Sequence, residues 1–238
     1  MAKLSGKIAV VTGGTGALGQ NVTKRLLMEG ATVIATHTGR SDTESSAIID
    51  HQVQNLSYDV LDVTNERSVG TFYDQLLSKH GRIDILCNLV GGIRQKKFIE
   101  DISFEEWNEM FRVNLDSCFL MTRNAVRSMK LNSFGRIINI TAMPAILPEP
   151  KRGGYGVAKA GVITLTKTVA EEVKGFGDIT VNAIAPSTIL TEANKQWGTE
   201  EEIKKWVTPG QIAEMIIVLC SDSGAAINGH IIQMYGKV

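Results

Sequence analysis

The stretch KIAVVTGGTGALG, residues 7–19, joins a short β-branched run to a turn with glycines spaced three residues apart. Such a run is typical of a strand buried on both faces, and the apolar stripe Leu18, Val22 and Leu26 predicts a helix after the turn, ended by Gly30. Glycines here let a diphosphate approach backbone N–H groups at the positive end of the helix, although glycines also occur in ordinary turns. We assign the candidate dinucleotide contacts of this turn to Gly13, Thr15, Gly16, Ala17, Leu18 and Gly19.

The rest of the chain continues the alternation of strands and helices. Strands are predicted at 31–36, 56–60 and 83–90, helices at 41–52 and from the turn at 62–64 to about residue 79, and a further apolar strand begins at 137. This order predicts one α/β domain, a doubly wound parallel sheet of about seven strands with helices on both faces. Ligands of such sheets bind outside the carboxyl ends of the strands, so Asn88 and Gly91 are expected at the mouth of the site.

The end of the second predicted strand reads THTGR, residues 36–40. In dinucleotide-binding folds an acid at this point binds the ribose 2′-hydroxyl, whereas a cation accepts a 2′-phosphate. His37 stands where the acid would be and Arg40 is close enough to reach a phosphate, so the sequence favours NADP over NAD, unless Arg40 is only a solvated loop residue. Asp62, after the third strand, either caps the next helix or binds an adenine amine, and the two roles are compatible.

The composition excludes several classes of function. Lys plus Arg and Asp plus Glu number 25 each in 238 residues, so no net charge attracts nucleic acid or an anionic membrane. No apolar run reaches membrane-spanning length, and the N-terminus lacks signal-peptide architecture. Cys87, Cys118 and Cys220 are odd in number and lie in apolar surroundings, which predicts buried thiols in a reducing compartment. The four histidines lack ligand spacing, so we expect a soluble cytoplasmic protein without a metal site.

The segment 137–159 reads as a strand, a proline-broken loop and a helix that begins near Gly154. Tyr155 and Lys159 are four residues apart on that helix and therefore share one face. An ammonium one turn away favours the phenolate and is expected to lower the pKa of Tyr155 toward the working range of a general acid and base. Taken alone, such a pair is also compatible with a packed ring beside a solvated cation.

Other features have two readings each. The loop 93–98 carries Arg94, Lys96 and Lys97, which form either a solvated basic loop or an anion-binding wall. Asn114 lies between apolar neighbours on a predicted helix and is either a buried hydrogen-bonding bridge or a member of a proton relay. Apolar residues at helical spacing are expected in the core, namely Phe104, Trp107, Met110, Phe111, Phe119, Leu120 and Val126.

Taken together, these features resemble the short-chain dehydrogenase/reductase family over nearly the whole chain. The matching pieces are TGGTGALG at 12–19, LDV at 61–63, CNLVGG at 87–92, VNL around Asn114, GRIINI at 135–140, YGVAK at 155–159 and VNAIAPSTILT at 181–191. The resemblance implies a single Rossmann-fold domain, commonly assembled as a dimer or tetramer. It further implies hydride transfer between NAD(P) and the carbonyl or alcohol carbon of a small molecule.

The resemblance also implies roles for particular residues. Tyr155 exchanges a proton with the substrate oxygen, Lys159 holds the nicotinamide ribose and lowers the pKa of Tyr155, and Asn114 anchors a water that links Lys159 to solvent. The segment after Pro186 contacts the nicotinamide carboxamide through Ile189 and Thr191. The remaining cofactor positions implied at the mouth of the site are Asp62, Val63, Asn88 and Gly91.

The chain departs from the family pattern at four places. The family has a serine thirteen residues before its tyrosine, whose hydroxyl binds the substrate oxygen, and this chain has Ala142 there. Losing such a donor typically costs on the order of 10²- to 10³-fold in rate. Thr141 is adjacent, but successive strand side chains point to opposite faces, so it should face away unless the strand has already ended. In the second departure, Ala17 stands in place of the usual middle glycine of the turn. In the third, NLVG at 88–91 stands for the family's N-N-A-G motif and Ser187 for a glycine after Pro186. In the fourth, the chain ends in MYGKV instead of the usual ending that contains Asp-Gly-Gly.

Two hypotheses about function follow. The first is an NAD(P)-dependent carbonyl reductase or alcohol dehydrogenase, favoured by Tyr155, Lys159 and Asn114 in their proper spacing. The second is a dinucleotide-binding sensor or interaction protein with little turnover, favoured by Ala142. Residues 192–208, with Trp197 and Trp206, are expected to form a substrate lid, although these rings are equally compatible with the packing of a short helix.

Overall fold

The computed structural model describes residues 2–39, 53–94 and 96–237. These residues form a seven-stranded sheet in which every strand pairs in parallel with its neighbours, in the order β3-β2-β1-β4-β5-β6-β7. The order reverses between β1 and β4, which is the doubly wound arrangement that the alternating pattern predicts. The strands are β1 Ile8–Val11, β2 Thr32–His37, β3 Leu56–Val60, β4 Ile85–Asn88, β5 Phe134–Ile140, β6 Asp178–Pro186 and β7 Ile231–Met234.

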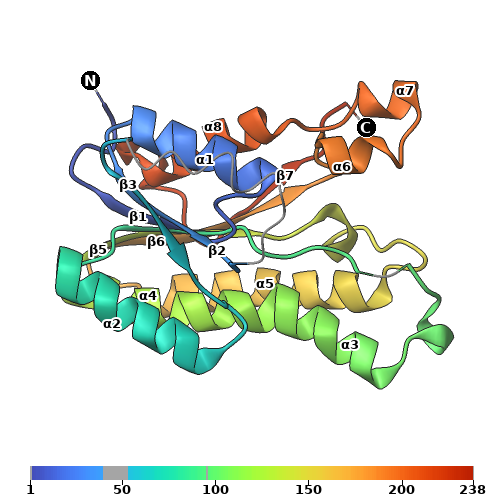
Figure 1. The fold of residues 1–238 in the computed structure, drawn as a ribbon, viewed down its shortest axis with the longest axis horizontal. Coiled ribbons are helices and arrows are strands. Elements are labelled where there is room, and N and C mark those ends of the chain that lie inside the picture. Colours follow the sequence, from blue (N-terminus) through green and yellow to red (C-terminus); the bar gives the residue numbers. More distant parts are fainter. Residues whose placement is uncertain (1, 40–52, 95, 238) are drawn as a thin grey trace.

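Helices cover both faces of the sheet, so the predicted fold class is confirmed (Figure 1). Figure 1 shows α1 and α8 on one face and α2, α4 and α5 on the other, with α6 and α7 near the C-terminus. The helices are α1 Ala17–Met28, α2 Glu66–His80, α3 Phe104–Phe111, α4 Ser117–Asn132, α5 Gly153–Glu172, α6 Glu192–Lys195, α7 Glu200–Ile203 and α8 Pro209–Cys220. The helix predicted at 41–52 lies outside the described residues.

Alternation along β1 explains why two separate cores form. Successive side chains of a strand point to opposite faces, so Val10 joins the core beneath α2, α4 and α5, whereas Val11 joins the core beneath α1 and α8. The stripe Val22 and Leu26 of α1 is fully buried in the second core, as the sequence pattern predicts. Burial on both faces explains why these strands read as continuous apolar runs.

Two apolar residues predicted for the core lie at the surface. Phe104 is 79% exposed and Phe119 is 43% exposed, whereas Met110 and Leu120 are buried as expected. Trp107 and Met110 face Gly154 at the start of α5, and Phe104 lies one turn before this contact. Helical spacing therefore identified the amphipathic stripe of α3 but not the length over which α5 covers it.

Candidate functional site

The glycine turn after β1 is fixed by backbone contacts to the two neighbouring strands. The N–H of Gly14 donates to the carbonyl of Thr36 at 2.8 Å. On the other side, the buried hydroxyl of Thr12 accepts from the N–H of Leu89 at 2.9 Å and of Val90 at 3.3 Å. The turn therefore lies at the carboxyl ends of β1, β2 and β4, where the strand order reverses.

The first turn of α1 is accessible at the rim of the sheet. Gly16 is the N-cap and no side chain caps the helix, while Gly16 and Ala17 are both exposed. Ala17 therefore replaces the family's usual glycine at an exposed position. The positive end of a twelve-residue helix that no side chain caps suits the diphosphate of a dinucleotide.

Close packing explains two of the glycines. A Cβ on Gly19 would collide with the carbonyl oxygen of Gly13, so only glycine lets α1 start this close to the turn. A Cβ on Gly14 would lie 2.6 Å from the Cβ of Ala35 on β2. The sequence pattern does not single out Gly14 or Thr12, because their partners come from strands far away in the chain.

The residues predicted to select the cofactor lie at the ends of β2 and β3. His37 ends β2, and its Nδ1 accepts from the N–H of Gly39 at 3.2 Å. Arg40 lies outside the described residues. Val63 is buried, whereas Asp62 is exposed, so of these two Asp62 is the one with an accessible side chain.

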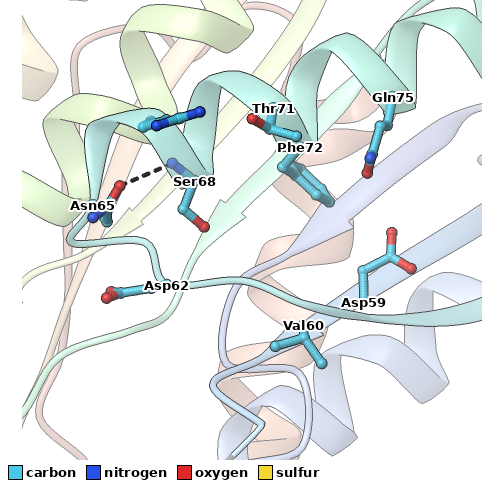
Figure 2. A pocket seen from close by; sticks show the side chains of 9 residues that line it. Asp59, Val60, Asp62, Asn65, Ser68, Thr71, Phe72 and Gln75 are labelled. Atoms are coloured by element: carbon cyan, nitrogen blue, oxygen red, sulfur yellow. Dashed lines mark hydrogen bonds between the residues drawn. The ribbon is translucent and has the colours of Figure 1, made fainter.

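Asp62 does not cap α2, which corrects one of its two predicted roles. The N-cap is Asn65, whose Oδ1 accepts from the N–H of Ser68 at 2.9 Å. Asp62 instead accepts from the N–H and the hydroxyl of Thr64 at 2.9 and 2.7 Å. It lines an open hollow of about 550 Å³ between β3 and α2 (Figure 2). The other lining residues are Asp59, Val60, Asn65, Arg67, Ser68, Thr71, Phe72 and Gln75.

The structure brings Lys159, Asn114 and Gly91 together at the rim. A methyl group added to Gly91 would lie 2.6 Å from Asn114 Oδ1 and 2.8 Å from Lys159 Nζ. Gly91 also has a φ of 151°, in the range that favours glycine. Three segments far apart in the sequence therefore meet at one point, and the absence of a side chain on Gly91 makes this possible.

Asn114 lies in a π-helical turn, Arg112–Asp116, between α3 and α4. It is fully buried, and its amide donates to the carbonyls of Met110 at 3.0 Å and Gly92 at 3.1 Å. Its Oδ1 accepts from the N–H of Gly92 at 2.8 Å. The side chain is thus a buried bridge that holds the segment after β4, which is the first of the two readings that the sequence left open. Turns of this type often occur at functional sites.

Lys159 is buried on α5, and its ammonium donates to the carbonyl of Ile140 at 2.8 Å. Burial lowers the pKa of Lys159 to about 8, and the neighbouring Cys118 opposes this change. Burial raises the pKa of Tyr155 to about 12, while the positive charge of Arg152 lowers it and the negative charge of Glu149 raises it further. The pKa of Tyr155 therefore lies above its ordinary value, opposite to the predicted direction, because desolvation dominates.

Thr141 does not replace the missing serine hydroxyl. Strand β5 ends at Ile140, and the hydroxyl of Thr141 donates to the carbonyl of Lys159 at 2.7 Å. Thr141 is therefore buried with its hydroxyl bonded to α5, although the strand ends one residue before it. Ala142 follows with an extended backbone and is 5% exposed.

Asn88 is directed into the protein rather than toward the mouth of the site. Its amide donates to Thr122 Oγ1 at 3.0 Å and to Asn139 Oδ1 at 2.9 Å, and the residue is 5% exposed. Asn139 in turn donates to Thr166 at 2.9 Å, so the network joins β4, α4, β5 and α5. Asn88 is the last residue of β4, at the carboxyl end of the strand as predicted, and its side chain fixes the sheet behind the site.

The segment after β6 and the loop 93–98 meet above the rim. Pro186 ends β6, Ile189 bridges to Val207, and the hydroxyl of Thr191 accepts from the N–H of Asn194 to cap α6 at 3.1 Å. Trp197 is 72% exposed, and the ammonium of Lys96 lies 4.8 Å from the centre of its ring. The predicted lid segment thus contacts the basic loop through a cation–π interaction between Lys96 and Trp197.

The other basic residues of that loop differ in their environment. Lys97 forms an ion pair with Glu106 at 2.6 Å, which neutralises part of the predicted anion-binding wall, whereas Arg94 is exposed. All three cysteines are buried free thiols, as predicted. The described residues contain no cluster of three metal-ligating side chains. Within the same residues, no helix is both long and apolar enough to cross a membrane.

Comparison with known proteins identifies the class to which this fold and site belong. The family model described as short chain dehydrogenase matches residues 7–202. A 3-oxoacyl-(acyl-carrier-protein) reductase FabG of Haemophilus influenzae is 34% identical, and a D-beta-hydroxybutyrate dehydrogenase of Rhizobium meliloti is 32% identical; the alignments cover 98% and 97% of both chains, respectively. The crystal structure of a putative gluconate dehydrogenase from Agrobacterium tumefaciens superimposes with a TM-score of 0.88 at 26% identity, covering 98% of this chain and 95% of that one.

A Rossmann-type sheet with a glycine turn at its switch point and a tyrosine–lysine helix at its rim is the architecture of a nicotinamide-dependent oxidoreductase. The chain belongs to the short chain dehydrogenase family. It is accordingly an NAD(P)-dependent oxidoreductase acting on CH–OH and C=O groups, and the alternative of a sensor without turnover is not favoured.

Proposed function

We propose that the chain transfers hydride reversibly between NAD(P) and carbon 3 of 3-oxoacyl or 3-hydroxyacyl compounds. The names of two relatives support this substrate class, because 3-oxoacyl chains and β-hydroxybutyrate both carry oxygen on the third carbon of an acyl chain. The observation that carries the proposal is the meeting of Lys159, Asn114 and Gly91 at the rim, on the helix that also bears Tyr155.

The chain's own geometry fits a nicotinamide dinucleotide. The uncapped first turn of α1 with the exposed Gly16 and Ala17 suits the diphosphate, and Asp62 at the end of β3 suits the adenine amine. Lys159 is the residue for the nicotinamide ribose, and the segment of Pro186, Ile189 and Thr191 would contact the carboxamide. The bound cofactor supplies the hydride that the substrate carbon gains or loses.

Tyr155 is the proposed general acid and base. With a pKa near 12 its phenol is protonated at neutral pH, so the proton needed by the oxygen of a reduced carbonyl is present. In the reverse direction the phenolate accepts the proton of the alcohol. Asn114 fixes the backbone behind Lys159 through Gly92, and we assign it a supporting role there.

The preference for NADP is a finer part of the proposal. It rests on the sequence at 37–40, where His37 replaces an acid and Arg40 follows. Titration with NADPH and NADH should give the tighter dissociation constant for NADPH, and Arg40→Ala should reduce the difference between the two. Equal affinities in the unmodified chain would contradict this preference.

We also propose that the chain forms a dimer or tetramer in the cytoplasm. Half-exposed Phe119 on α4 and Val157 on α5 support an apolar contact on the helical face that carries both helices. Light scattering after size exclusion measures the molar mass directly. The mass of a single 25.9 kDa chain at micromolar concentration would contradict the proposal.

The central test is the oxidation of NADPH and NADH with acetoacetate, an acetoacetyl thioester and simple ketones without a second oxygen. We expect the two 3-oxo compounds to be reduced faster than the simple ketones, and Tyr155→Phe to lose this activity while it still binds dinucleotide. If the unmodified chain and Tyr155→Phe turn over equally, the proposed role of Tyr155 is wrong. If simple ketones react best, the substrate class is wrong.

A further inference from the structure

Two of the places where the chain departs from its family pattern meet in space. Ser187 follows β6, and the ending MYGKV begins at Met234, the last residue of β7. The N–H of Ser187 donates to the carbonyl of Met234 at 3.0 Å, and its hydroxyl donates to the carbonyl of Tyr235 at 3.0 Å. A glycine at position 187 could form the first bond but not the second. Ser187 therefore adds a side-chain bond between the segments that follow β6 and β7.

The predicted lid, residues 192–208, is closed at a narrow neck. Ile189 pairs with Val207 as a β-bridge, and the N–H of Leu190 donates to the carbonyl of Val207 at 2.8 Å. Val207 is 2% exposed in the core beneath α1 and α8, and Ile189 packs against the same core. The two sides of the neck are thus joined to each other and anchored in the core.

Residues 235–237, which follow β7, bridge the two sides of this neck, and we refer to them as the strap. On one side, the carbonyl of Tyr235 accepts the hydroxyl of Ser187. On the other side, the N–H of Lys237 donates to the carbonyl of Lys205 at 2.9 Å. Figure 1 shows the C-terminus beside α6 and α7, the two helices of the lid.

Gly236 lets the strap lie directly against the backbone of the lid. Its φ is 72°, in the left-handed range that favours glycine. A Cβ at this position would collide with the carbonyl oxygen of Lys205 and lie 3.2 Å from the nitrogen of Val207. The contact between strap and lid therefore depends on the absence of a side chain, as a specifically fitted contact does.

The lid has internal packing of its own. A Cβ on Gly198 would lie 2.5 Å from ring atoms of Trp206, and Thr199 caps the short helix α7. Trp197 is exposed and meets Lys96 of the loop 93–98. A loop packed by its own side chains moves as a unit about its ends, so contacts at the neck set its position.

We propose that the strap fixes the neck of the lid, and that Ser187 and Gly236 are positioning residues for the substrate and for the nicotinamide end of the cofactor. The inference rests on the proposed function, in which Pro186, Ile189 and Thr191 contact the carboxamide and the lid covers the substrate. Because the strap holds both sides of the neck, releasing it would loosen these contacts together.

The test compares Gly236→Ala and Ser187→Ala with the matched control Gly229→Ala. Gly229 precedes β7 and has a φ of 76°, but a Cβ there would meet Ala170 at an ordinary distance of 3.4 Å. Gly229→Ala therefore reproduces the backbone strain at the opposite end of the same strand without touching the lid. Ser187→Ala removes only the hydroxyl and is the milder variant. Thermal unfolding shows that each variant is folded.

Tryptic cleavage measures the opening of the lid without reference to activity. The lid carries three exposed lysines at which trypsin cuts, namely Lys195, Lys204 and Lys205. Ser187→Ala should be cut in the lid about fivefold faster than the unmodified chain, since the loss of one hydrogen bond shifts a local opening equilibrium by about this factor. Gly236→Ala should be cut on the order of tenfold faster, because it adds a collision. Gly229→Ala should be cut at the unmodified rate, and mass spectrometry locates the cuts.

Binding of NADH and of ADP-ribose separates positioning from general loosening. ADP-ribose keeps the adenine and the diphosphate but lacks the nicotinamide. The two strap variants should bind NADH more weakly than the unmodified chain does and ADP-ribose equally well. In the same variants the KM of acetoacetate should rise about fivefold while kcat changes by less than about twofold.

The proposal and the proposed function fail in different ways. If Gly236→Ala and Ser187→Ala match Gly229→Ala in lid cleavage, the strap does not fix the lid. If the strap variants lose affinity for NADH and ADP-ribose equally, the positioning role is wrong. If their lids are cut faster but the unmodified chain does not reduce acetoacetate or the acetoacetyl thioester, the strap fixes the lid and the proposed substrate class is wrong.

Discussion

The glycine turn after β1 and the rim that carries Lys159 lie at the same edge of the sheet, but they depend on opposite features of their residues. At the turn after β1, function depends on side chains that are absent, because Gly14 meets Ala35 and Gly19 meets the carbonyl of Gly13. At the rim, function depends on side chains held by hydrogen bonds, as in Lys159 to Ile140 and Asn114 to Gly92. The turn tolerates little added volume, and under the proposed function it binds through its backbone, whereas the rim depends on single polar atoms.

The largest effect is expected at the rim. Tyr155→Phe removes one hydroxyl and should lower kcat by on the order of 10³-fold, since positioned acid–base groups contribute about 10²- to 10⁴-fold. Stopped-flow or steady-state NADPH oxidation measures the rate, and fluorescence titration measures dinucleotide binding, which should persist. Loss of dinucleotide binding in this variant would mean that the turn and the rim are not separate in the way described.

The next largest effect is expected at the glycine turn after β1. Gly19→Ala adds a methyl group against the Gly13 carbonyl and should destabilise the fold by about 1–3 kcal/mol, with weaker dinucleotide binding. Gly70→Ala is the matched control, because Gly70 lies inside α2 with nothing within 4 Å of an added Cβ. It should be stabilising by about 0.5–1 kcal/mol. Urea unfolding measures both, and equal stabilities for the two variants would contradict the packing argument.

Ala142→Ser adds a hydrogen-bond donor at the rim. Removing such a donor costs on the order of 10²-fold or more, so restoring it in a site that has not been tuned for it should raise kcat by roughly tenfold. Ala142 has room only for a small side chain, since it is 5% exposed, and Ala142→Val serves as a control for volume without a hydroxyl. An unchanged or lower rate in Ala142→Ser would mean that another group donates to the substrate oxygen.

The smallest effect concerns the stability of the rim. The pKa of Lys159 is about 8 in the folded chain, against 10.5 as its ordinary value. The unfolded chain therefore holds a proton that the folded chain has released, so the contribution of Lys159 to folding stability rises with pH from about 8 to about 10. The gain should reach about 1–2 kcal/mol by pH 9.5 without added dinucleotide.

Urea unfolding at several pH values checks this prediction. Lys159→Met should lose the rise, whereas Lys167→Met, which changes an exposed lysine on the same helix, should keep it. Parallel curves for the unmodified chain and Lys159→Met would show that the folded chain keeps this proton.

Part of the site was predictable because its signals are local. The glycine spacing at 13, 16 and 19, the strand before it and the shared helix face of Tyr155 and Lys159 all follow from residues close together in the chain. The burial of all three cysteines was likewise predicted from their apolar neighbours. Local sequence patterns fix backbone geometry directly, so these predictions did not depend on the rest of the fold.

Other features were decided by segments far apart in the chain. Asn88 turns toward Asn139 and Thr122, and the pKa of Tyr155 rises rather than falls, because both depend on which strands and helices surround them.

The sequence by itself determined the doubly wound sheet, the position of the glycine turn and the placing of Tyr155 and Lys159 one turn apart on a single helix, since periodicity and spacing encode them. Only the tertiary structure decided where each polar side chain finds its partner and how much water it loses. Hydrogen bonds and desolvation depend on neighbours in space, and those neighbours are set by the packing of the whole chain.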